Sequence, residues 1–413
     1  MLLLYNLAIR LYLLAIRLAA PFVPKAARWR SGRRDLFEQL EAALPAARPL
    51  LWMHCASLGE FEQGRPLLGA LRQQYPQHFL LLTFFSPSGY DIRQHYDQVD
   101  YVSYLPADTP ARARRFVRLT QPQLAIFVKY EFWYHHLHAL HQAGVPTLLV
   151  SALFRPQQLF FRPWGHFLRP ILHWYHHLFV QDEASKQLLA RWGITTVSRS
   201  GDTRVDRVAQ LAGQALADPL VEAFAGSQPV LIAGSSWPAD EALLCRYINE
   251  AAPSDWKLII APHDIAPSHV QQIEGRLRVS YCRYSAAQRE DAAAARVLIV
   301  DNIGKLSSIY RYGHIAYIGG GFGSGIHNTL EPAAYGLPVI FGPRYSKFTE
   351  AVQLIAEKGA FSIKDYAQLR AVLERLREVE EHQRAAKASK TYIRQQLGAT
   401  DAVINSIKKM LKS

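Results

Sequence analysis

The chain has few cysteines and no pattern of metal ligands. Its 413 residues include three cysteines, which lie far apart at Cys55, Cys245 and Cys282. Their odd number and wide spacing give no disulfide framework and no zinc-binding motif, which is typical of a reducing compartment. The histidines between His135 and His177 have no set of acidic ligands beside them, so a partly protonated helix surface is favoured over a zinc site. We therefore expect neither a metal nor another cofactor.

Acidic residues are scarce relative to basic ones. The 34 Asp and Glu residues are outnumbered by 47 Lys and Arg residues, which gives a formal net charge of +13. Such a balance favours anionic partners, namely nucleic acid, phospholipid head groups or a phosphorylated substrate. The sequence contains neither a zinc-finger spacing nor an RNA-binding signature, so nucleic acid is not expected as the main partner.

The apolar N-terminal segment lacks the uninterrupted run of a simple membrane-spanning helix. Arg10 and Arg17 interrupt Met1–Pro24, and their spacing of seven residues places them on one helical face. No small-residue cleavage site of a signal peptide follows, and a core helix would not need the basic cluster that comes next, Lys25, Arg28, Arg30, Arg33 and Arg34. The pattern predicts an amphipathic helix in the membrane interface, or a short hairpin in one leaflet, held to phospholipid on the cytoplasmic side.

The remaining length predicts two α/β domains. Hydrophobic residues make up 49% of the chain and charged residues 20%, enough for two cores. Short apolar runs alternate with helical segments, which is typical of parallel sheets covered on both faces, with ligands at the carboxyl ends of the strands. We place an anchor at residues 1–34, a first domain at 35–205 and a second at 206–413. The expected strands are Leu50–His54, Phe79–Phe84, Tyr101–Leu105, Leu124–Val128, Thr147–Val150, Leu178–Val180, Gln228–Ser235, Trp256–Ala261, Arg296–Val300, Ile315–Ile318 and Val339–Phe341.

Glycines cluster within Tyr317–Glu350. Five of them fall in seven residues after an expected strand, and a short helix then begins near His327. A glycine loop that leads into a helix N-terminus offers free N–H groups and a favourable dipole to a phosphate. Glu331 in the first turn could accept hydrogen bonds from ribose hydroxyls. A purely structural strand–turn–helix remains the alternative for such a short motif.

Ser57 and Glu60 are spaced as a capping box. In that motif each side chain accepts a hydrogen bond from a backbone N–H at the helix start. Glu60 is also a candidate general base, because it follows the Leu50–His54 strand at the edge where ligands bind. Both roles are open from the residues alone.

These motifs resemble one family. The strand, the glycines, His327-Asn-x-Leu-Glu-Pro and Gly336-x-Pro resemble the nucleotide-binding signature of glycosyltransferases built from two Rossmann-like domains. Within that group the chain is most similar to the 3-deoxy-D-manno-octulosonic acid (Kdo) transferases of lipopolysaccharide synthesis. The resemblance implies an α/β fold of the GT-B type, with two Rossmann-like domains facing across a cleft. It also implies metal-independent, inverting transfer of Kdo from CMP-Kdo to lipid A precursor at the cytoplasmic face of a bacterial inner membrane.

The resemblance implies roles for residues of the first domain. In His54-Cys-Ala-Ser-Leu-Gly-Glu60 the glutamate corresponds to the general base, and Glu131 to a residue that supports the transition state. Arg204 stands where the family has a lysine that balances charge on the departing nucleotide. Ser88, Gly89 and Arg155 are candidates on the acceptor side. The chain departs from the family at Lys129, where a glutamate is usual, and at Tyr134, where proline is usual.

The resemblance also implies a donor site in the second domain. Three positions differ from the family pattern: Trp237 replaces a histidine, His263 an arginine and Lys305 a glutamate, and Lys305 could reach a phosphate. The residues implied to bind CMP-Kdo are Ser235, Pro262, His263, Ile303, Gly304, Lys305, Gly320, Gly321, Asn328, Thr329, Leu330 and Glu331.

Two other functions remain open at this point. The first is another nucleotide-sugar transferase or an epimerase of the same fold, although an epimerase would not need the anchor. The second is a non-catalytic membrane-binding protein in which Glu60 is only a helix cap. The chain has no Asp-x-Asp pair of the kind that holds a metal-bound diphosphate.

Overall fold

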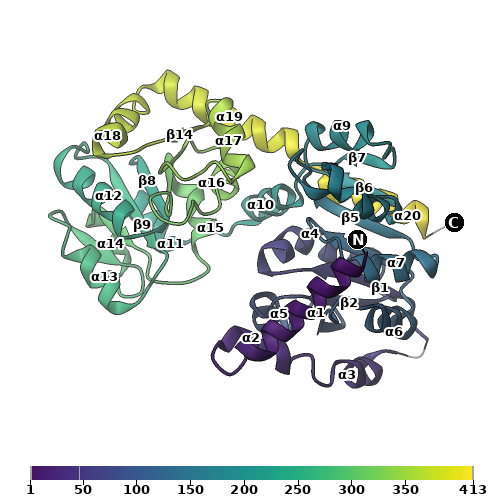
Figure 1. Ribbon diagram of the computed structural model, residues 1–413. Coiled ribbons are helices and arrows are strands. Elements are labelled where there is room, and N and C mark those ends of the chain that lie inside the picture. The colour runs from purple at the N-terminus through teal and green to yellow at the C-terminus, as the bar shows by residue number, and fades with distance from the viewer. Residues whose placement is uncertain (1, 46, 412–413) are drawn as a thin grey trace. The chain divides into compact units, whose positions relative to one another are not determined.

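The computed structural model describes residues 2–45 and 47–411, and the chain divides into two compact units (Figure 1). The first unit comprises Met1–Asp206 and Leu397–Ser413, and the second comprises Arg207–Gln396. The expected boundary near residue 206 falls at the division. The expected second domain also included the last helix, which instead packs with the first unit because its apolar face joins that core.

The first unit is built on a seven-stranded parallel sheet. Its strand order is β3-β2-β1-β4-β5-β6-β7, and it pairs in register, for example Leu50 with Phe79 and Leu51 with Leu124. Apolar residues fill both faces of the central strands, as expected when helices cover both sides. The strands are β1 (Leu50–Cys55), β2 (Phe79–Phe84), β3 (Tyr101–Tyr104), β4 (Leu124–Val128), β5 (Thr147–Ala152), β6 (His177–Val180) and β7 (Val197–Arg199).

Helices cover the two faces of this sheet unequally. One core contains residues of α3 (Leu36–Ala43), α6 (Pro110–Thr120), α7 (Tyr134–Gln142), α8 (Arg169–Trp174) and α9 (Glu183–Arg191). The core on the other face contains residues of α4 (Leu58–Gln74) and α20 (Ala399–Met410). The short helix α5 (Pro87–Arg93) follows β2, and two 3₁₀ turns, η1 (Leu159–Phe161) and η2 (Pro163–Leu168), precede α8.

The second unit repeats the architecture. Its parallel sheet has the order β10-β11-β9-β8-β12-β13-β14. The expected strands Ile315–Ile318 and Val339–Phe341 are confirmed with those bounds. Three strands were not expected from the sequence, β7, β10 and β14, because three residues with polar members carry too little apolar pattern. The strands are β8 (Val230–Ser236), β9 (Lys257–Pro262), β10 (Tyr281–Arg283), β11 (Val297–Ile299), β12 (Ile315–Ile318), β13 (Val339–Phe341) and β14 (Ala360–Ser362).

The helices of the second unit pack on this sheet. Helix α10 (Thr203–Gln214) begins within the first unit, which runs to Asp206, and continues into the second. One core combines the strands with apolar residues of α12, α13, α18 and α19. The helices are α11 (Pro219–Ala225), α12 (Pro238–Glu250), α13 (Pro267–Glu274), α14 (Arg289–Ala294), α15 (Leu306–Ile309), η3 (Tyr310–Tyr312), α16 (Leu330–Ala334), α17 (Thr349–Ala356), α18 (Tyr366–Arg375) and α19 (Val379–Gln396).

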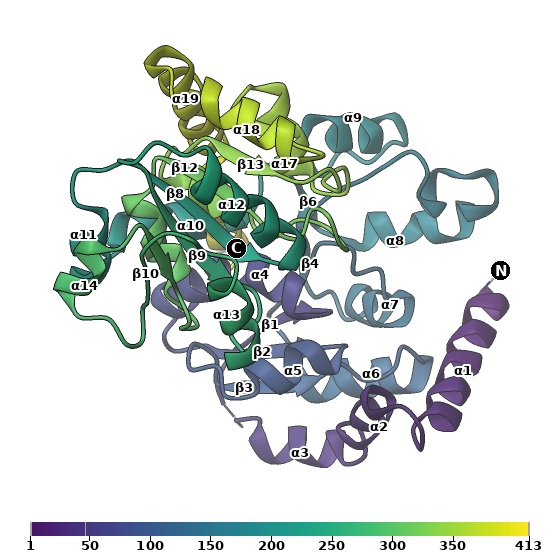
Figure 2. The ribbon, with the colours of Figure 1, turned by 90° about the vertical axis from the view of Figure 1, so that its left-hand side faces the viewer.

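Two helices precede the first sheet. Helix α1 (Leu2–Ala19) lies at the periphery of the first unit and is followed by α2 (Pro24–Ser31) (Figure 2). It docks through polar contacts: the Tyr5 hydroxyl donates to Asp108 at 2.5 Å, and Asn6 Oδ1 lies 2.6 Å from His135 Nε2. By length and composition α1 could cross a membrane, and none of its residues is buried.

Candidate active site

Glu60 lies in the first turn of α4, directly after β1. The Ser57 side chain caps this helix by accepting from the Gly59 N–H at 3.3 Å, and its hydroxyl also bonds the Glu60 carboxylate. The expected reciprocal capping box is therefore only half formed, because Glu60 contacts the Ser57 hydroxyl and not its backbone N–H. Glu62 faces another way and pairs with Arg93 at 3.0 Å. Half-buried, Glu60 has an oxygen left for a further partner.

Glu131 is buried at the end of β4, with 5% of its surface exposed. Its Oε2 accepts from Trp133 Nε1 at 2.5 Å and lies 3.1 Å from His54 Nε2. The chain of hydrogen bonds continues inward: His54 Nδ1 lies 2.9 Å from Thr83 Oγ1, which accepts from Trp52 Nε1 at 2.8 Å. With His54 in its Nε2–H tautomer, every group of this relay has a partner. The relay satisfies a carboxylate that burial alone would make costly.

Glu60 and Glu131 act on the same buried thiol. Burial raises the pKa of Cys55 well above its usual value, and the negative charges of Glu60 and Glu131 raise it further. Arg155 lies in the same region: with Glu60 it influences the pKa of Tyr130, which burial raises. Arg155 itself pairs with Asp182 at 3.0 Å.

Arg204 lies at the start of α10 and pairs with Asp202. Its Nε and Nη2 donate to Asp202 Oδ2 at 2.9 and 2.6 Å. Asp206, two residues on, instead accepts from the backbone N–H groups of Gly398 and Thr400 at 2.7 and 2.6 Å. Asp202 is thus a residue that sequence reasoning missed, although its spacing of two from Arg204 was visible.

The acceptor-side candidates Ser88 and Gly89 lie in the first turn of α5. The Ser88 hydroxyl lies 3.0 Å from the Ser86 hydroxyl, and Ser86 caps the helix. Gly89 is buried, and a Cβ there would overlap the Phe84 ring. Gly89 is thus needed for close packing against Phe84, whereas Ser88 presents a hydroxyl at the carboxyl edge of β2.

Three of the five non-glycine residues with positive φ in the described part of the chain lie near strand ends. Lys129, Ser151 and Ser235 have φ values of +72°, +53° and +52°, although none is glycine. They follow or end β4, β5 and β8, where parallel sheets bind ligands. Strained non-glycine residues cost free energy and tend to cluster at functional sites. The positive φ values of these residues could not be predicted from their residue types.

The second unit contains a cavity of about 290 Å³ at the carboxyl ends of β8 and β12. Four of the expected donor residues line it: Ser235, Gly304, Asn328 and Glu331. Asn328 Nδ2 donates to Glu331 Oε1 at 2.9 Å, and Asn328 Oδ1 accepts from the Leu330 N–H at 3.0 Å. The remaining lining residues are Leu306, Ser307, Tyr310, Ile318 and His327, which were not in the expected set.

The glycine loop is held by Asp240, which is fully buried in α12. Its carboxylate accepts from the Gly320 N–H at 2.9 Å, the Tyr317 hydroxyl at 2.7 Å and the Trp237 N–H at 3.0 Å. Gly320 has a φ of +90°, and Gly321 packs against the Gly342 backbone. The expectation of free loop amides is therefore wrong for Gly320, and also for Gly323 and Gly325, whose N–H groups donate to the Gly320 carbonyl.

The other expected donor residues lie outside the cavity lining. Ile303 is 87% exposed, whereas Thr329 and Leu330 are fully buried. The Lys305 ammonium lies 3.4 Å from the Asp218 carboxylate, and its side chain is partly exposed. Pro262 ends β9.

His263 belongs to a stack of rings that sequence reasoning did not assemble. Trp237 stacks on His263 at 4.7 Å between centroids, and His263 on His327 at 4.7 Å. Trp237 Nε1 donates to His327 Nε2 at 3.0 Å. Burial, and then the neighbouring His263, lower the pKa of His327, which keeps that nitrogen an acceptor. Trp237 and His263, two of the positions that differ from the family pattern, are therefore in contact with each other.

Within residues 2–45 and 47–411 no cluster of three or more His, Cys, Asp or Glu residues suits a metal.

Solved structures of other proteins have a similar fold. UDP-GlcNAc 2-epimerase from Neisseria meningitidis, bound to UDP-GlcNAc, matches 87% of this chain and 100% of its own with a TM-score of 0.61 and 15% identity. UGT2 of Phytolacca americana, in complex with UDP-2fluoro-glucose and pterostilbene, matches 88% of this chain and 100% of its own with a TM-score of 0.56 and 12% identity. These likenesses establish the α/β fold of the GT-B type.

Comparison of sequences indicates which class of enzyme with this fold the chain resembles. Residues 28–207 match the family model for 3-deoxy-D-manno-octulosonic-acid transferase. The transferase of that name from Bordetella pertussis is 28% identical over 97% of this chain and 99% of its own length, and that from Aquifex aeolicus is 27% identical over 79% and 86%. The protein is therefore a glycosyltransferase. Its sequence is similar to that of Kdo transferases over most of the chain.

Proposed function

We propose that this enzyme transfers Kdo from CMP-Kdo to lipid A precursor (lipid IVA) in lipopolysaccharide synthesis, with inversion at the anomeric carbon. The names of its sequence relatives support Kdo as the sugar. The observation that carries the chemistry is the half-buried Glu60 at a helix start, bound by Ser57 alone among the residues described.

Glu60 acts as the general base. A sugar hydroxyl becomes a sufficient nucleophile when its proton is removed as it attacks. The hydroxyl oxygen bonds the anomeric carbon, the bond from that carbon to the phosphate oxygen breaks, and CMP leaves with the electron pair. The proton remains on Glu60 until solvent takes it.

Glu131 and Arg204 have supporting roles in this proposal. Through Oε2, Glu131 bonds His54 and Trp133, so it orders the end of β4 and adds negative charge near the developing oxocarbenium character. Arg204 balances charge on the departing phosphate. Its bond to Asp202 fixes the guanidinium in one direction, which lowers the reorganisation needed in the transition state.

The donor is assigned to the 290 Å³ cavity of the second unit. Asn328 and Glu331 offer polar groups to the ribose and phosphate, and the rings of Trp237, His263 and His327 offer planar surfaces to cytosine. The exposed apolar face of α1 supports attachment to the cytoplasmic face of the inner membrane, where a lipid acceptor is found. No metal is invoked, because these charges and dipoles suffice for the proposed step.

The test is transfer from freshly generated CMP-Kdo to tetra-acylated lipid A precursor. Glu60→Gln keeps the size of the side chain but removes the base, and we expect the rate to fall by about 10²–10⁴-fold. Glu62→Gln is the matched control on the same helix and should retain most activity. CMP binding, followed by thermal shift, should persist in both variants.

Three results would overturn parts of the proposal. Equal rates for wild type and Glu60→Gln would leave Glu60 as a helix cap. Retention of the anomeric configuration in the product would exclude direct displacement. Absence of product with wild type, together with no protection by CMP, would point to another nucleotide sugar.

A further inference from the structure

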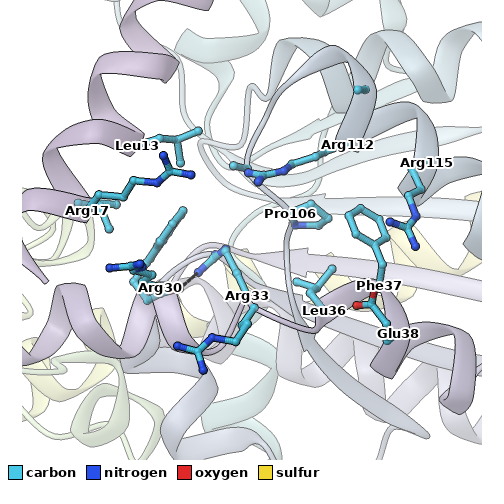
Figure 3. A pocket seen from close by; sticks show the side chains of 15 residues that line it. Leu13, Arg17, Arg30, Arg33, Leu36, Phe37, Glu38, Pro106, Arg112 and Arg115 are labelled. Atoms are coloured by element: carbon cyan, nitrogen blue, oxygen red, sulfur yellow. Dashed lines mark hydrogen bonds between the residues drawn. The ribbon is translucent and has the colours of Figure 1, made fainter.

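A second cavity, of about 630 Å³, lies within the first unit between α1, α2, α3 and α6. Figure 3 shows Arg17 and Arg112 reaching into it from different elements. Its lining carries one carboxylate, Glu38, and six guanidinium groups, from Arg17, Arg30, Arg33, Arg34, Arg112 and Arg115. Neither Glu60, Glu131, Arg204 nor Ser88 lines this cavity, so it is distinct from the proposed reaction site.

Two of the six guanidinium groups are already occupied. Arg115 pairs with Glu41 at 3.1 Å. Arg33 donates to the carbonyl oxygens of Leu105 and Phe85 at 2.9 and 2.7 Å, and it stacks on the Trp29 ring at 3.9 Å. The other four have no acidic partner among residues 2–45 and 47–411: Arg17, Arg30, Arg34 and Arg112.

An unpaired donor accompanies these charges. Trp29 lines the cavity with only 8% of its surface exposed, and its Nε1–H has no hydrogen-bond partner in the described part of the chain. A buried N–H without an acceptor costs roughly 1–3 kcal/mol. Burial lowers the pKa of Arg33 to about 9, and the positive charge of Arg112 contributes in smaller part. Positive charges therefore repel one another in this cavity. An anion with oxygen acceptors would relieve both conditions.

The surroundings indicate which anion. Leucines at helical spacing form an exposed stripe along α1, namely Leu3 (82%), Leu7 (51%), Leu11 (56%), Leu14 (50%) and Leu18 (67%). Arg17 precedes Leu18 on the same helix and turns toward the cavity (Figure 3). One helix thus joins an apolar surface to a cationic cavity. A ligand that matches both carries acyl chains and a phosphate.

We propose that this cavity binds the phosphate head group of an anionic glycerophospholipid of the membrane. The guanidinium groups of Arg17, Arg30 and Arg112 match phosphate oxygens in forked geometry, and the Trp29 N–H donates to one of them. The bound lipid holds α1 and α2 in one orientation at the bilayer surface. The inference rests on the membrane attachment in the proposed function.

The experiment measures binding of the full-length protein to vesicles of phosphatidylcholine with or without phosphatidylglycerol. The test variant is Arg30→Gln/Arg112→Gln. The control Arg28→Gln/Arg118→Gln changes the same two helices and the same net charge, but neither residue lines the cavity. We expect the test pair to lose at least about tenfold more affinity for phosphatidylglycerol vesicles than the control pair, because it removes two charge-assisted contacts.

A second variant with a smaller change controls for misfolding of the double arginine variant. Trp29→Phe keeps the ring and removes the N–H, and should weaken binding to phosphatidylglycerol vesicles by about two- to tenfold. Soluble glycerol 1-phosphate should compete with those vesicles for wild type but not for Arg30→Gln/Arg112→Gln.

The outcomes separate the possible sources of the phosphate. Equal losses in the test and control pairs would overturn the proposal in favour of general charge attraction. A third set of vesicles contains tetra-acylated lipid A precursor in place of phosphatidylglycerol. If the test pair lost affinity for that set alone, the proposal would also be overturned, and the cavity would be assigned to the acceptor's phosphates. Failure of wild type to bind either vesicle would instead refute the membrane attachment itself.

Discussion

At the scale of single residues, two carboxylates at neighbouring strand ends are prepared for different tasks. Glu131 is buried, and its Oε2 accepts from two donors, His54 and Trp133. Glu60 is half-buried and bonds one hydroxyl, that of Ser57. Only Glu60 combines exposure with a free oxygen. The difference lies in the surroundings and not in the residue type.

Thr83→Val should destabilise the first unit by about 1–3 kcal/mol, because it leaves Trp52 Nε1 and His54 Nδ1 without their shared hydroxyl. The free energy of unfolding in urea measures the effect. Thr120→Val is the matched control, since that buried hydroxyl only donates to the Phe116 carbonyl four residues earlier. A cost for Thr83→Val no larger than the control's would mean that the relay does not hold His54.

Gly320→Ala should abolish protection of the protein by CMP. The residue has a φ of +90°, and an added Cβ would overlap the Gly325 carbonyl, so the loop must move. Gly323→Ala in the same loop places its Cβ 3.6 Å from the Gly320 carbonyl oxygen, an ordinary contact, and should behave as wild type. Thermal shift with added CMP compares the two. Equal protection would show that the donor does not depend on the shape of this loop.

At the scale of elements, α20 completes a core formed by residues hundreds of positions earlier. Val403, Ile404 and Ile407 are buried against β1, β2 and α4, and Asp206 binds the start of the helix. Because the helix carries apolar residues on one face only, it is stable through this packing.

Ile407→Ala should therefore cost about 2–5 kcal/mol, the range for truncating a fully buried aliphatic side chain. Asn405→Ala on the exposed face of the same helix is the control and should change stability little. Chemical denaturation of the full chain measures both. If the two variants unfolded at the same denaturant concentration, α20 would not be part of the first core.

At the scale of the whole molecule, charge and apolar surface reinforce each other. The net charge of +13 draws the protein toward anionic surfaces, and the leucine stripe of α1 supplies burial that salt does not screen. The proposed membrane attachment thus has two physically separable parts.

Leu7→Asp/Leu14→Asp should abolish most binding to phosphatidylglycerol vesicles, because two apolar contacts become charged. Leu216→Asp/Val379→Asp adds the same charge at exposed apolar positions of the second unit and should weaken binding far less. Vesicle flotation at low and high salt measures both pairs. Equal behaviour of the pairs would contradict a role for the stripe.

The sequence by itself determined the alternation of strands and helices, because short apolar runs between helical segments admit little else. It also located Glu60 and the cavity residues Ser235, Asn328 and Glu331 at strand ends or in the loops and helix starts that follow strands. Whether these residues act in the reaction stays a prediction. The local motifs were accessible because their members are neighbours along the chain.

Only the tertiary structure decided which distant groups meet. His54 reaches Glu131 across 77 positions, Asp240 holds Gly320 across 80, and Asp206 binds α20 across 192. It also turned Arg17, Arg30 and Arg112 toward one cavity, where the sequence showed only a basic cluster. Hydrogen bonds and ion pairs depend on distance in space, and one sequence without its fold does not contain those distances.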